Sequence, residues 1–351
     1  MRAWTSNLVS ACLAAALLDA CGGGTNNQSP STLTSIPPPM GAQRFASLGS
    51  LLPRGSGHLY VANGGPAPGA VTVYVPSTAF LLRTISQGVS NPVALAFDSS
   101  RNLYVSNYNV NTVTVYAPGS TSVLRTISQG LDFPVALAFD SSGNLYVANR
   151  YGNTITVYAP GGTSVLRTYR QGISGPSALA FSGSGNFFVA NSYGNTVTVY
   201  PPGVRRVQRT ISQGVKAPAG LAFDHSGNLY VSNYDNNTVT VYGPGKTSVQ
   251  RTISQGVVVP VTLAFDRSGN LYVENYGGNT ITVYAPGKNS VLRTISQGLN
   301  HPYGMTFSAL GYLFVANFVA STVTVYAPGS TSVHLTIAQG VDSPFALAFG
   351  P

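Results

Sequence analysis

Cysteine is almost absent from this chain of 351 residues. Its two copies, Cys12 and Cys21, both lie close to the N-terminus, and none follows them. A framework of disulfide bonds is therefore excluded for the rest of the chain. Whatever stabilises the fold must come from packing and hydrogen bonding.

Charged side chains are also scarce, at 8% of the residues, although the net charge is +9. A basic protein that binds nucleic acid normally gathers its charge into a patch or stripe. Here Arg205 and Arg206 form the one local basic pair, and the other recurring arginines are spaced 42 residues apart: Arg83, Arg125, Arg167, Arg209, Arg251 and Arg293. Even spacing spreads the charge over the molecule, so we predict no binding to nucleic acid.

Repetition is what the chain has in abundance. Seven near-copies of a 42-residue unit fill residues 58–351. One copy contains Asn-Leu-Tyr-Val-Ala-Asn at 144–149, Thr-Ile-Thr-Val-Tyr at 154–158 and Ala-Leu-Ala-Phe at 178–181. A period of this length is typical of repeat architectures, in which each unit packs on its neighbours.

Each unit contains four short runs with the patterning of β-strands, separated by turn residues. In one unit these strands, a to d, are expected at 92–97, 103–106, 112–116 and 123–127. Large residues alternate with alanine in strand a, so its two faces differ in bulk. We expect the bulky face of one unit to pack against the small face of the next.

The first and last units are incomplete in a complementary way. The repeats begin at a strand b, near Leu59, and finish with a strand a at 344–349. Joined, these parts make one complete unit, which is how a β-propeller closes its ring. We predict an all-β fold: a monomeric seven-bladed β-propeller of four-stranded antiparallel blades, with the C-terminal strand a joining the N-terminal strands b, c and d.

The N-terminal residues resemble a bacterial secretory signal. Residues 1–20 contain one basic residue, Arg2, and an apolar stretch at 8–18 that is too short to span a bilayer. The segment Leu-Asp-Ala-Cys at 18–21 resembles the lipobox of bacterial lipoproteins, which implies that Cys21 is lipidated. Asp19 departs from that motif. Two alternatives therefore stay open: lipidation at Cys12, or cleavage without a lipid.

Residues 21–57 are rich in Gly, Ser, Thr, Asn and Pro, which is the composition of a flexible tether. We therefore predict a protein of the bacterial cell envelope, held at the membrane by its lipid alone, or else secreted. Gly22 follows Cys21 where lipoproteins retained at the inner membrane carry aspartate. By this analogy the outer membrane and the periplasmic side are favoured.

Residues 58–351 resemble YVTN-type and NHL-type β-propeller repeats. The first resemblance rests on Leu-Tyr-Val-Ala-Asn at 145–149 followed by Asn-Thr-Ile-Thr-Val-Tyr at 153–158. The second rests on the recurring segments Pro-x-Ala-Leu-Ala-Phe-Asp and Gly-Asn-Leu-Tyr-Val. The resemblance implies an extracytoplasmic or scaffold-like binding ring. Propeller relatives include lactonases and lyases of the virginiamycin B type, so the fold alone does not separate binding from catalysis.

Residues suited to catalysis are sparse. A metal-dependent lactonase needs oxygen ligands that converge on the channel, and a lyase needs a histidine base with a carboxylate partner. Neither set is visible, and four aspartates share one repeat position where we expect them to cap turns: Asp98, Asp140, Asp224 and Asp266. We predict no catalytic residue, no metal and no cofactor.

Three residues break the repeat on one expected face. Glu274 stands where the other units have Ala or Ser, Asp235 lies in a b–c loop, and His301 precedes the proline of the next strand a. The b–c and d–a loops of a propeller share one face, so these residues should lie near Tyr234 and Tyr276. We predict a site for a small polar ligand or a cation there.

A wider binding surface is the alternative to that site. The asparagine that ends each strand b and the aromatic residues beside it suit sugars or peptides: Tyr108, Tyr151, Tyr193, Tyr234, Tyr276 and Phe318. We expect a non-enzymatic binding scaffold for an unknown protein or glycan partner. The competing interpretation is a propeller-type hydrolase or lyase, lactonase-like, with a metal at the loop face.

Overall fold

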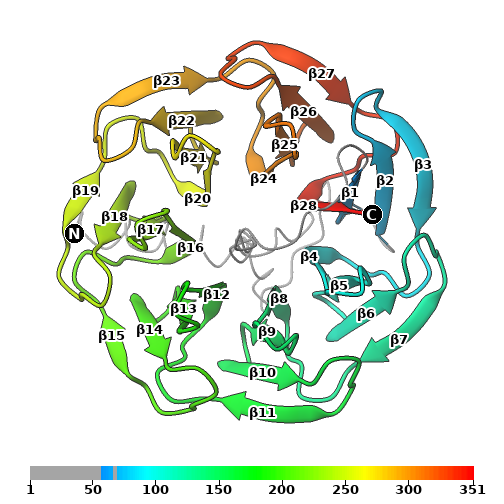
Figure 1. Ribbon diagram of the computed structural model, residues 1–351. Helices are drawn as coiled ribbons and strands as arrows, with labels where there is room; N and C mark the ends of the chain where they lie inside the picture. Colours follow the sequence, from blue (N-terminus) through cyan, green and yellow to red (C-terminus); the bar gives the residue numbers. More distant parts are fainter. Residues whose placement is uncertain (1–56, 66–68) are drawn as a thin grey trace, which may run out of the picture. The chain divides into compact units, whose positions relative to one another are not determined.

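The seven repeats form seven blades in a closed ring (Figure 1). The computed structural model describes residues 57–65 and 69–351. Over these ranges each blade is a sheet of four antiparallel strands, and the secondary structure contains no helix. The predicted fold class is confirmed.

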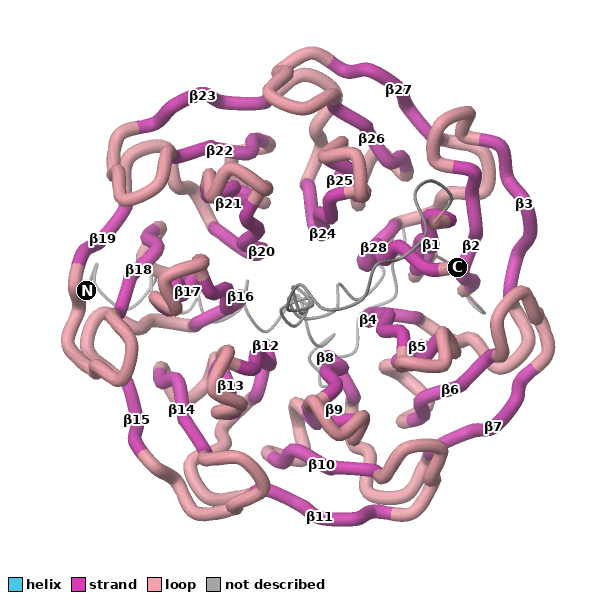
Figure 2. Tube along the Cα trace, in the orientation of Figure 1, coloured by secondary structure: helices cyan, strands magenta, loops and turns pink. Residues whose placement is uncertain are grey.

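The four strands of each blade run from the central axis to the rim, in the order a, b, c, d (Figure 2). Blade 1 consists of β4 (Pro92–Phe97), β5 (Leu103–Asn107), β6 (Thr112–Tyr116) and β7 (Val123–Ile127). Blade 2 consists of β8 (Pro134–Phe139), β9 (Leu145–Asn149), β10 (Thr154–Tyr158) and β11 (Val165–Tyr169). Blade 3 consists of β12 (Pro176–Phe181), β13 (Phe187–Asn191), β14 (Thr196–Tyr200) and β15 (Arg209–Ile211). Blade 4 consists of β16 (Pro218–Phe223), β17 (Leu229–Asn233), β18 (Thr238–Tyr242) and β19 (Arg251–Ile253). Blade 5 consists of β20 (Pro260–Phe265), β21 (Leu271–Asn275), β22 (Thr280–Tyr284) and β23 (Val291–Ile295). Blade 6 consists of β24 (Pro302–Phe307), β25 (Leu313–Asn317), β26 (Thr322–Tyr326) and β27 (Val333–Ile337). Blade 7 consists of β28 (Pro344–Gly350), β1 (His58–Asn63), β2 (Ala70–Val75) and β3 (Phe80–Ile85).

Blade 7 closes the ring as the sequence predicted. The C-terminal β28 pairs with the N-terminal β1, with Leu59 opposite Phe349 and Val61 opposite Leu347. The Asp342 N–H, in the loop before β28, donates to the Oδ1 of Asn63 at 3.1 Å. The last strand of the chain is therefore the innermost strand of the first blade.

Adjacent blades pack a bulky face against a small one. In one core cluster Ala94 of β4 lies with Leu137 and Phe139 of β8, so the alanine side of blade 1 meets the large side of blade 2. The predicted alternation in strand a is thus confirmed. It lets seven similar sheets bury both faces without voids.

A second contact between blades is aromatic. Tyr104 of β5 meets Phe139 of the next blade edge to face, with ring centroids 5.1 Å apart. The Arg125 guanidinium on the rim strand β7 lies 5.7 Å from the Tyr104 ring centroid and donates to its hydroxyl at 2.7 Å. Arg125 thus lies at the rim and covers the aromatic contact between blades 1 and 2.

The asparagine that ends strand b is a bridging residue rather than a simple turn former. In blade 1 the Oδ1 of Asn107 accepts the N–H of Ser90 at 3.0 Å, and its amide donates to the hydroxyls of Thr112 and Thr114. The side chain is fully buried. It therefore ties the incoming d–a loop to strand c of the same blade.

Left-handed backbone occurs at two neighbouring sites that link consecutive blades. Asn111, in the b–c loop of blade 1, has φ 53°, and Phe133, in the d–a loop entering blade 2, has φ 50°. The Phe133 N–H donates to the Oδ1 of Asn111 at 2.6 Å. The same latch joins His301 to Asn279 at 2.6 Å. These bonds fix the b–c and d–a loops against each other on one face.

Several predictions fall on residues outside the described ranges. They are the signal at 1–20, the lipidation of Cys21 or Cys12, and the tether at 21–57 apart from Gly57. In the part of the chain that the structure covers, no helix has the length and apolar character needed to cross a membrane.

Candidate functional site

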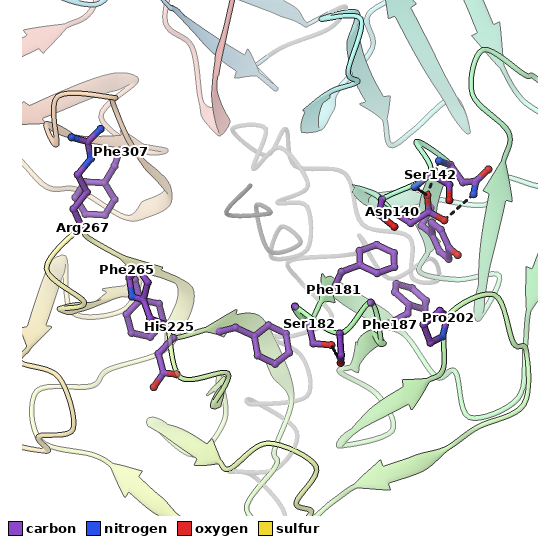
Figure 3. Close-up of a pocket in the computed structure, with 18 of the residues that line it drawn as sticks. Asp140, Ser142, Phe181, Ser182, Phe187, Pro202, His225, Phe265, Arg267 and Phe307 are labelled. Atoms are coloured by element: carbon purple, nitrogen blue, oxygen red, sulfur yellow. Dashed lines mark hydrogen bonds between the residues drawn. The ribbon is translucent and has the colours of Figure 1, made fainter. Parts of the chain in front are cut away.

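The a–b and c–d turns surround a cavity at one end of the central axis. Its volume is about 1150 Å³. Phe181, Phe265 and Phe307, which end the inner strands of blades 3, 5 and 6, lie around it (Figure 3). His225 lines the same cavity, on the face opposite the b–c loops.

Two charged side chains at this end already have partners. The Oδ1 of Asp140 accepts the N–H groups of Ser142 and Asn144, both at 2.9 Å, so the aspartate caps its turn as expected. Arg167 donates to the Gly203 carbonyl at 3.0 Å. These two groups are thus engaged in the protein's own turns and are less available to orient a ligand.

The b–c and d–a loops at the other end carry a layer of aromatic side chains. Phe133 meets Tyr108 at a centroid distance of 4.9 Å and Tyr151 at 4.7 Å. Across the ring, Tyr303 of β24 meets Tyr276 at 5.7 Å and Phe345 of β28 at 5.4 Å. Residues from blades 1, 2, 5, 6 and 7 thus converge at this end of the axis.

Arg150 lies within this aromatic layer and is 3% exposed. It follows Asn149 in blade 2, and its Nε donates to the Tyr193 hydroxyl of blade 3 at 3.3 Å. Its guanidinium carbon lies 4.8 Å from the centroid of the Tyr193 ring. The Nη1 group is buried and has no hydrogen-bond partner. The positive charge is therefore held by stacking and one hydrogen bond.

The charge of Arg150 acts across the ring. It lowers the pKa of Tyr108 in blade 1 and of Tyr303 in blade 6, although burial is the larger effect and raises both pKa values. Blades 2 and 6 are not neighbours (Figure 1), so this influence must pass across the central axis. Both tyrosines stay protonated near neutral pH and can donate hydrogen bonds.

Two buried tyrosine hydroxyls belong to the same layer. The Tyr234 hydroxyl makes no hydrogen bond, whereas the Tyr108 hydroxyl interacts with the Tyr151 side chain, which raises the pKa of Tyr108 further. Burial raises the pKa of Tyr234, and the neighbouring Tyr276 and Asp235 raise it further. Buried polar groups in native proteins almost always have partners. Together with Arg150 Nη1, the Tyr234 hydroxyl marks the b–c face as the place where a ligand could satisfy such groups.

The structure brings most of the predicted site together on this face. Tyr276 contacts the His301 ring at a centroid distance of 4.9 Å, and Tyr234 and Tyr276 both act electrostatically on Tyr303. Asp235 is exposed; partial burial raises its pKa and the nearby Lys216 opposes the shift. The His301 Nδ1 lies 2.9 Å from the Oδ1 of Asn300.

Glu274 does not lie on the loop surface where the sequence placed it. It is inside β21 and is fully buried, on the side that faces blade 6. The equivalent Ser106 and Ser232 use that position to donate to backbone carbonyls of the next blade, at 2.7 and 2.9 Å. As the structure stands, no ligand can reach this carboxyl directly.

Burial raises the pKa of Glu274 to about 8, although the Thr262 side chain and the Gly304 backbone favour its charged form. Neither carboxyl oxygen makes a hydrogen bond of good geometry. In blade 1, Ala94 of β4 is paired with Ser106 of β5 in the strand register. In blade 5, the corresponding pair between Thr262 of β20 and Glu274 of β21 is missing. The larger side chain has opened the ladder at this point, and Gly304 leaves room for it.

Arg150 and Tyr303 were missed by the sequence reasoning. A signal for both existed, since each departs from the repeat: Arg150 stands where three other units have Tyr, and Tyr303 where most units have Val, Ser or Ala. The wider aromatic set was also misaligned in part, because Tyr151 and Tyr193 come one position later than Tyr108. What could not be read from the sequence was that Arg150 in blade 2 lies close enough to Tyr303 in blade 6 to act on its pKa.

No protein-family model and no curated protein matches the chain. Among solved structures, a functionally unknown protein from Desulfotomaculum acetoxidans superposes with a TM-score of 0.71, at 16% identity over 84% of this chain and 99% of the other. A candidate 6-phosphogluconolactonase from Bacteroides fragilis gives 0.71 at 17% identity, covering 84% and 98%. A virginiamycin B lyase from Staphylococcus aureus gives 0.64 at 13% identity, covering 73% and 87%. At these identities the similarity shows a shared β-propeller fold, and the YVTN and NHL resemblance rests on the repeat residues alone.

Proposed function

We propose that this protein is a non-enzymatic binding module of the bacterial cell envelope, which takes a glycan or protein partner on its b–c face. The observation that carries the proposal is a set of buried polar groups in one aromatic layer: Arg150 Nη1 and the Tyr234 hydroxyl, which lack partners, and the Tyr108 hydroxyl, which interacts with Tyr151. Tyr193 is 47% exposed and touches Arg150, so the layer is open to solvent on that side. Aromatic rings with a few oriented donors are typical of binding sites for sugars and peptides.

A thermal-shift screen of the purified protein against envelope glycans and peptides tests this function. A ligand of the folded state raises the melting temperature by mass action. The double variant Tyr108→Phe/Tyr234→Phe should lose most of the shift, because it removes both buried hydroxyls and keeps the rings. Tyr312→Phe, on the opposite face, is the matched control. A shift that is unchanged in the double variant would place the ligand elsewhere.

The proposed location rests on the N-terminal residues. A lipid on Cys21 and a tether over residues 21–57 would hold the propeller near a membrane, with the outer membrane favoured. Radiolabelled palmitate should label the wild-type protein and should not label Cys21→Ala, which should also leave the membrane fraction. Label that survives Cys21→Ala and disappears in Cys12→Ala would support the alternative site.

The enzymatic alternative has weaker support. Within residues 57–65 and 69–351 no group of three or more His, Cys, Asp or Glu side chains could hold a metal ion. Glu274 has the raised pKa of a general acid, but it is sealed between two blades. The names of the lyase and lactonase neighbours describe those proteins. Turnover of a lactone or a cyclic peptide ester, lost in Glu274→Gln, would favour the enzyme over the binding module.

A further inference from the structure

Arg150 is a buried cation at a position that the other repeats fill with neutral residues. Arg150 and Glu274 are the buried residues of formal charge in the portion that the structure describes. The other units place Tyr, Phe, Ser or Gly at the position of Arg150. Burial of an unpaired charge is costly, and a neutral side chain of similar volume is normally more stable. Because a buried charge at the position of Arg150 lowers stability, we expect Arg150 to serve a function other than folding.

The groups around Arg150 are donors of hydrogen bonds. Its Nη1 and the Tyr234 hydroxyl of blade 4 are unpartnered, and the buried Tyr108 hydroxyl of blade 1 interacts with Tyr151. Burial keeps both phenols protonated, so neither neutralises the guanidinium. Glu274, which acts on the same Tyr303 ring, has a pKa raised to about 8 and is largely uncharged at neutral pH. Two other charged groups lie on this face: Asp235, which acts on Tyr234, is exposed and has Lys216 nearby. Among the buried groups, Arg150 therefore supplies the charge, and the tyrosine hydroxyls supply further donors.

That chemistry suits one particular class of ligand. Hydrogen bonds between a guanidinium and a carboxylate are among the strongest in proteins, and they strengthen away from water. A single positive charge matches a monoanion better than a phosphate of charge near two. The rings of Tyr193 and Tyr276 provide flat apolar contact for the body of such a ligand.

We propose that the centre of the b–c face binds a carboxylate group, with Arg150 as its anchor and the hydroxyls of Tyr108 and Tyr234 as further donors. This inference rests on the proposed function and narrows it to acidic ligands. The carboxylate of a sugar acid and the C-terminal carboxylate of a peptide have the same chemistry, and the experiment separates them.

Binding of small acids to the full-length protein at pH 7 tests the proposal, with isothermal titration or saturation-transfer NMR as the readout. The probes are benzoate against benzamide, N-benzoylglycine against its amide, and galacturonate against galactose. The acid of at least one pair should bind about tenfold or more tightly than its neutral partner, as expected for one charged hydrogen bond. The pair with the larger ratio identifies the source, a peptide or a sugar acid. Inorganic phosphate should bind more weakly than that acid.

Arg150→Gln should abolish the preference for the acid, and Arg150→Lys should keep part of it. Arg167→Gln is the matched control, since it removes the same charge from the rim strand of the same blade and should change nothing. The melting temperature of Arg150→Gln without ligand should equal or exceed that of the wild type, because a buried charge is removed.

Several results would overturn the proposal. They are equal binding of each acid and its neutral partner, equal losses in Arg150→Gln and Arg167→Gln, or no acid binding at all. A lower melting temperature in Arg150→Gln with unchanged acid binding would make Arg150 a structural residue. If neutral glycans or peptide amides still bind and depend on Tyr108, the binding function stands and the carboxylate assignment alone fails. If no glycan or peptide of any charge binds, the proposed function fails with it.

Discussion

Glu274 should make this protein less stable as the pH rises. Its carboxyl has an ordinary pKa of 4.5, which burial raises to about 8 in the folded protein. Above pH 4.5 the unfolded chain loses this proton, whereas the folded chain keeps it until about pH 8. The folded state then binds more protons, so the free energy of unfolding falls with pH between these values and levels off above pH 8.

The expected size follows from the distance between the two pKa values. Each pH unit in this window costs about 1.4 kcal/mol, so the loss relative to pH 4 is about 3 kcal/mol at pH 7 and about 5 kcal/mol above pH 8. Glu274→Gln has no proton to lose. The unfolding free energy of the variant minus that of the wild type should therefore increase with pH by these amounts. A further difference, which does not depend on pH, reflects how well the glutamine amide fits the buried position.

Urea titrations followed by circular dichroism, at intervals from pH 4 to pH 9, measure that difference. Asp235→Asn is the matched control, because it makes the same chemical change on the neighbouring blade at an exposed side chain. Its difference curve should be much flatter. Parallel curves for the wild type and Glu274→Gln would refute the reasoning, since they would mean that Glu274 ionises alike in both states.

Three further changes test the packing around the site. Gly175→Ala should cost about 1–3 kcal/mol in urea unfolding, because φ is 57° there and a new Cβ would lie 2.3 Å from the Tyr193 ring; Gly183→Ala, with open space around it, should have little effect. Arg125→Leu should change the unfolding free energy by about 1 kcal/mol or less in the same assay, since arginine contacts at half-buried rim positions are weak and blade 6 already has Leu335 at this position. Phe345→Ala, on the closing strand and 1% exposed, should cost about 3–5 kcal/mol, measured by the same titration.

Each of these predictions has its own contradicting result. A wild-type stability for Gly175→Ala would mean that Tyr193 does not rest on that backbone. A large loss for Arg125→Leu would show that the guanidinium contributes more than a half-buried rim contact should. A small loss for Phe345→Ala would mean that β28 contributes little to ring closure.

Much of the blade could be predicted because its determinants are local. The alternation of large and small residues determines the two faces of strand a, and the positions of proline, glycine and asparagine determine the turns. As a result, β4 and β7 begin and end at the residues that the sequence predicted. The complementary ends of the first and last units predicted the pairing of β28 with β1. Repetition strengthened each inference, since seven copies give the same answer.

The candidate site was predictable only in part. Tyr234, Tyr276 and His301 meet on the b–c face because topology alone assigns their loops to it. Glu274 was misplaced, since a break in the repeat was taken to lie on the loop surface. A residue near the end of strand b can also point into the next blade, as Ser106 does.

The sequence by itself determined the number of blades, the strands within them and the way the ring closes, because these depend on neighbours close in the chain or on a strict repeat. The tertiary structure decided which departures from the repeat meet. Arg150 in blade 2 and Tyr303 in blade 6 are far apart in the chain and in the order of blades, yet in the closed ring the charge of Arg150 acts on the pKa of Tyr303. Their burial, and hence the unmet hydrogen bonds and shifted pKa values, exists only once seven sheets enclose them.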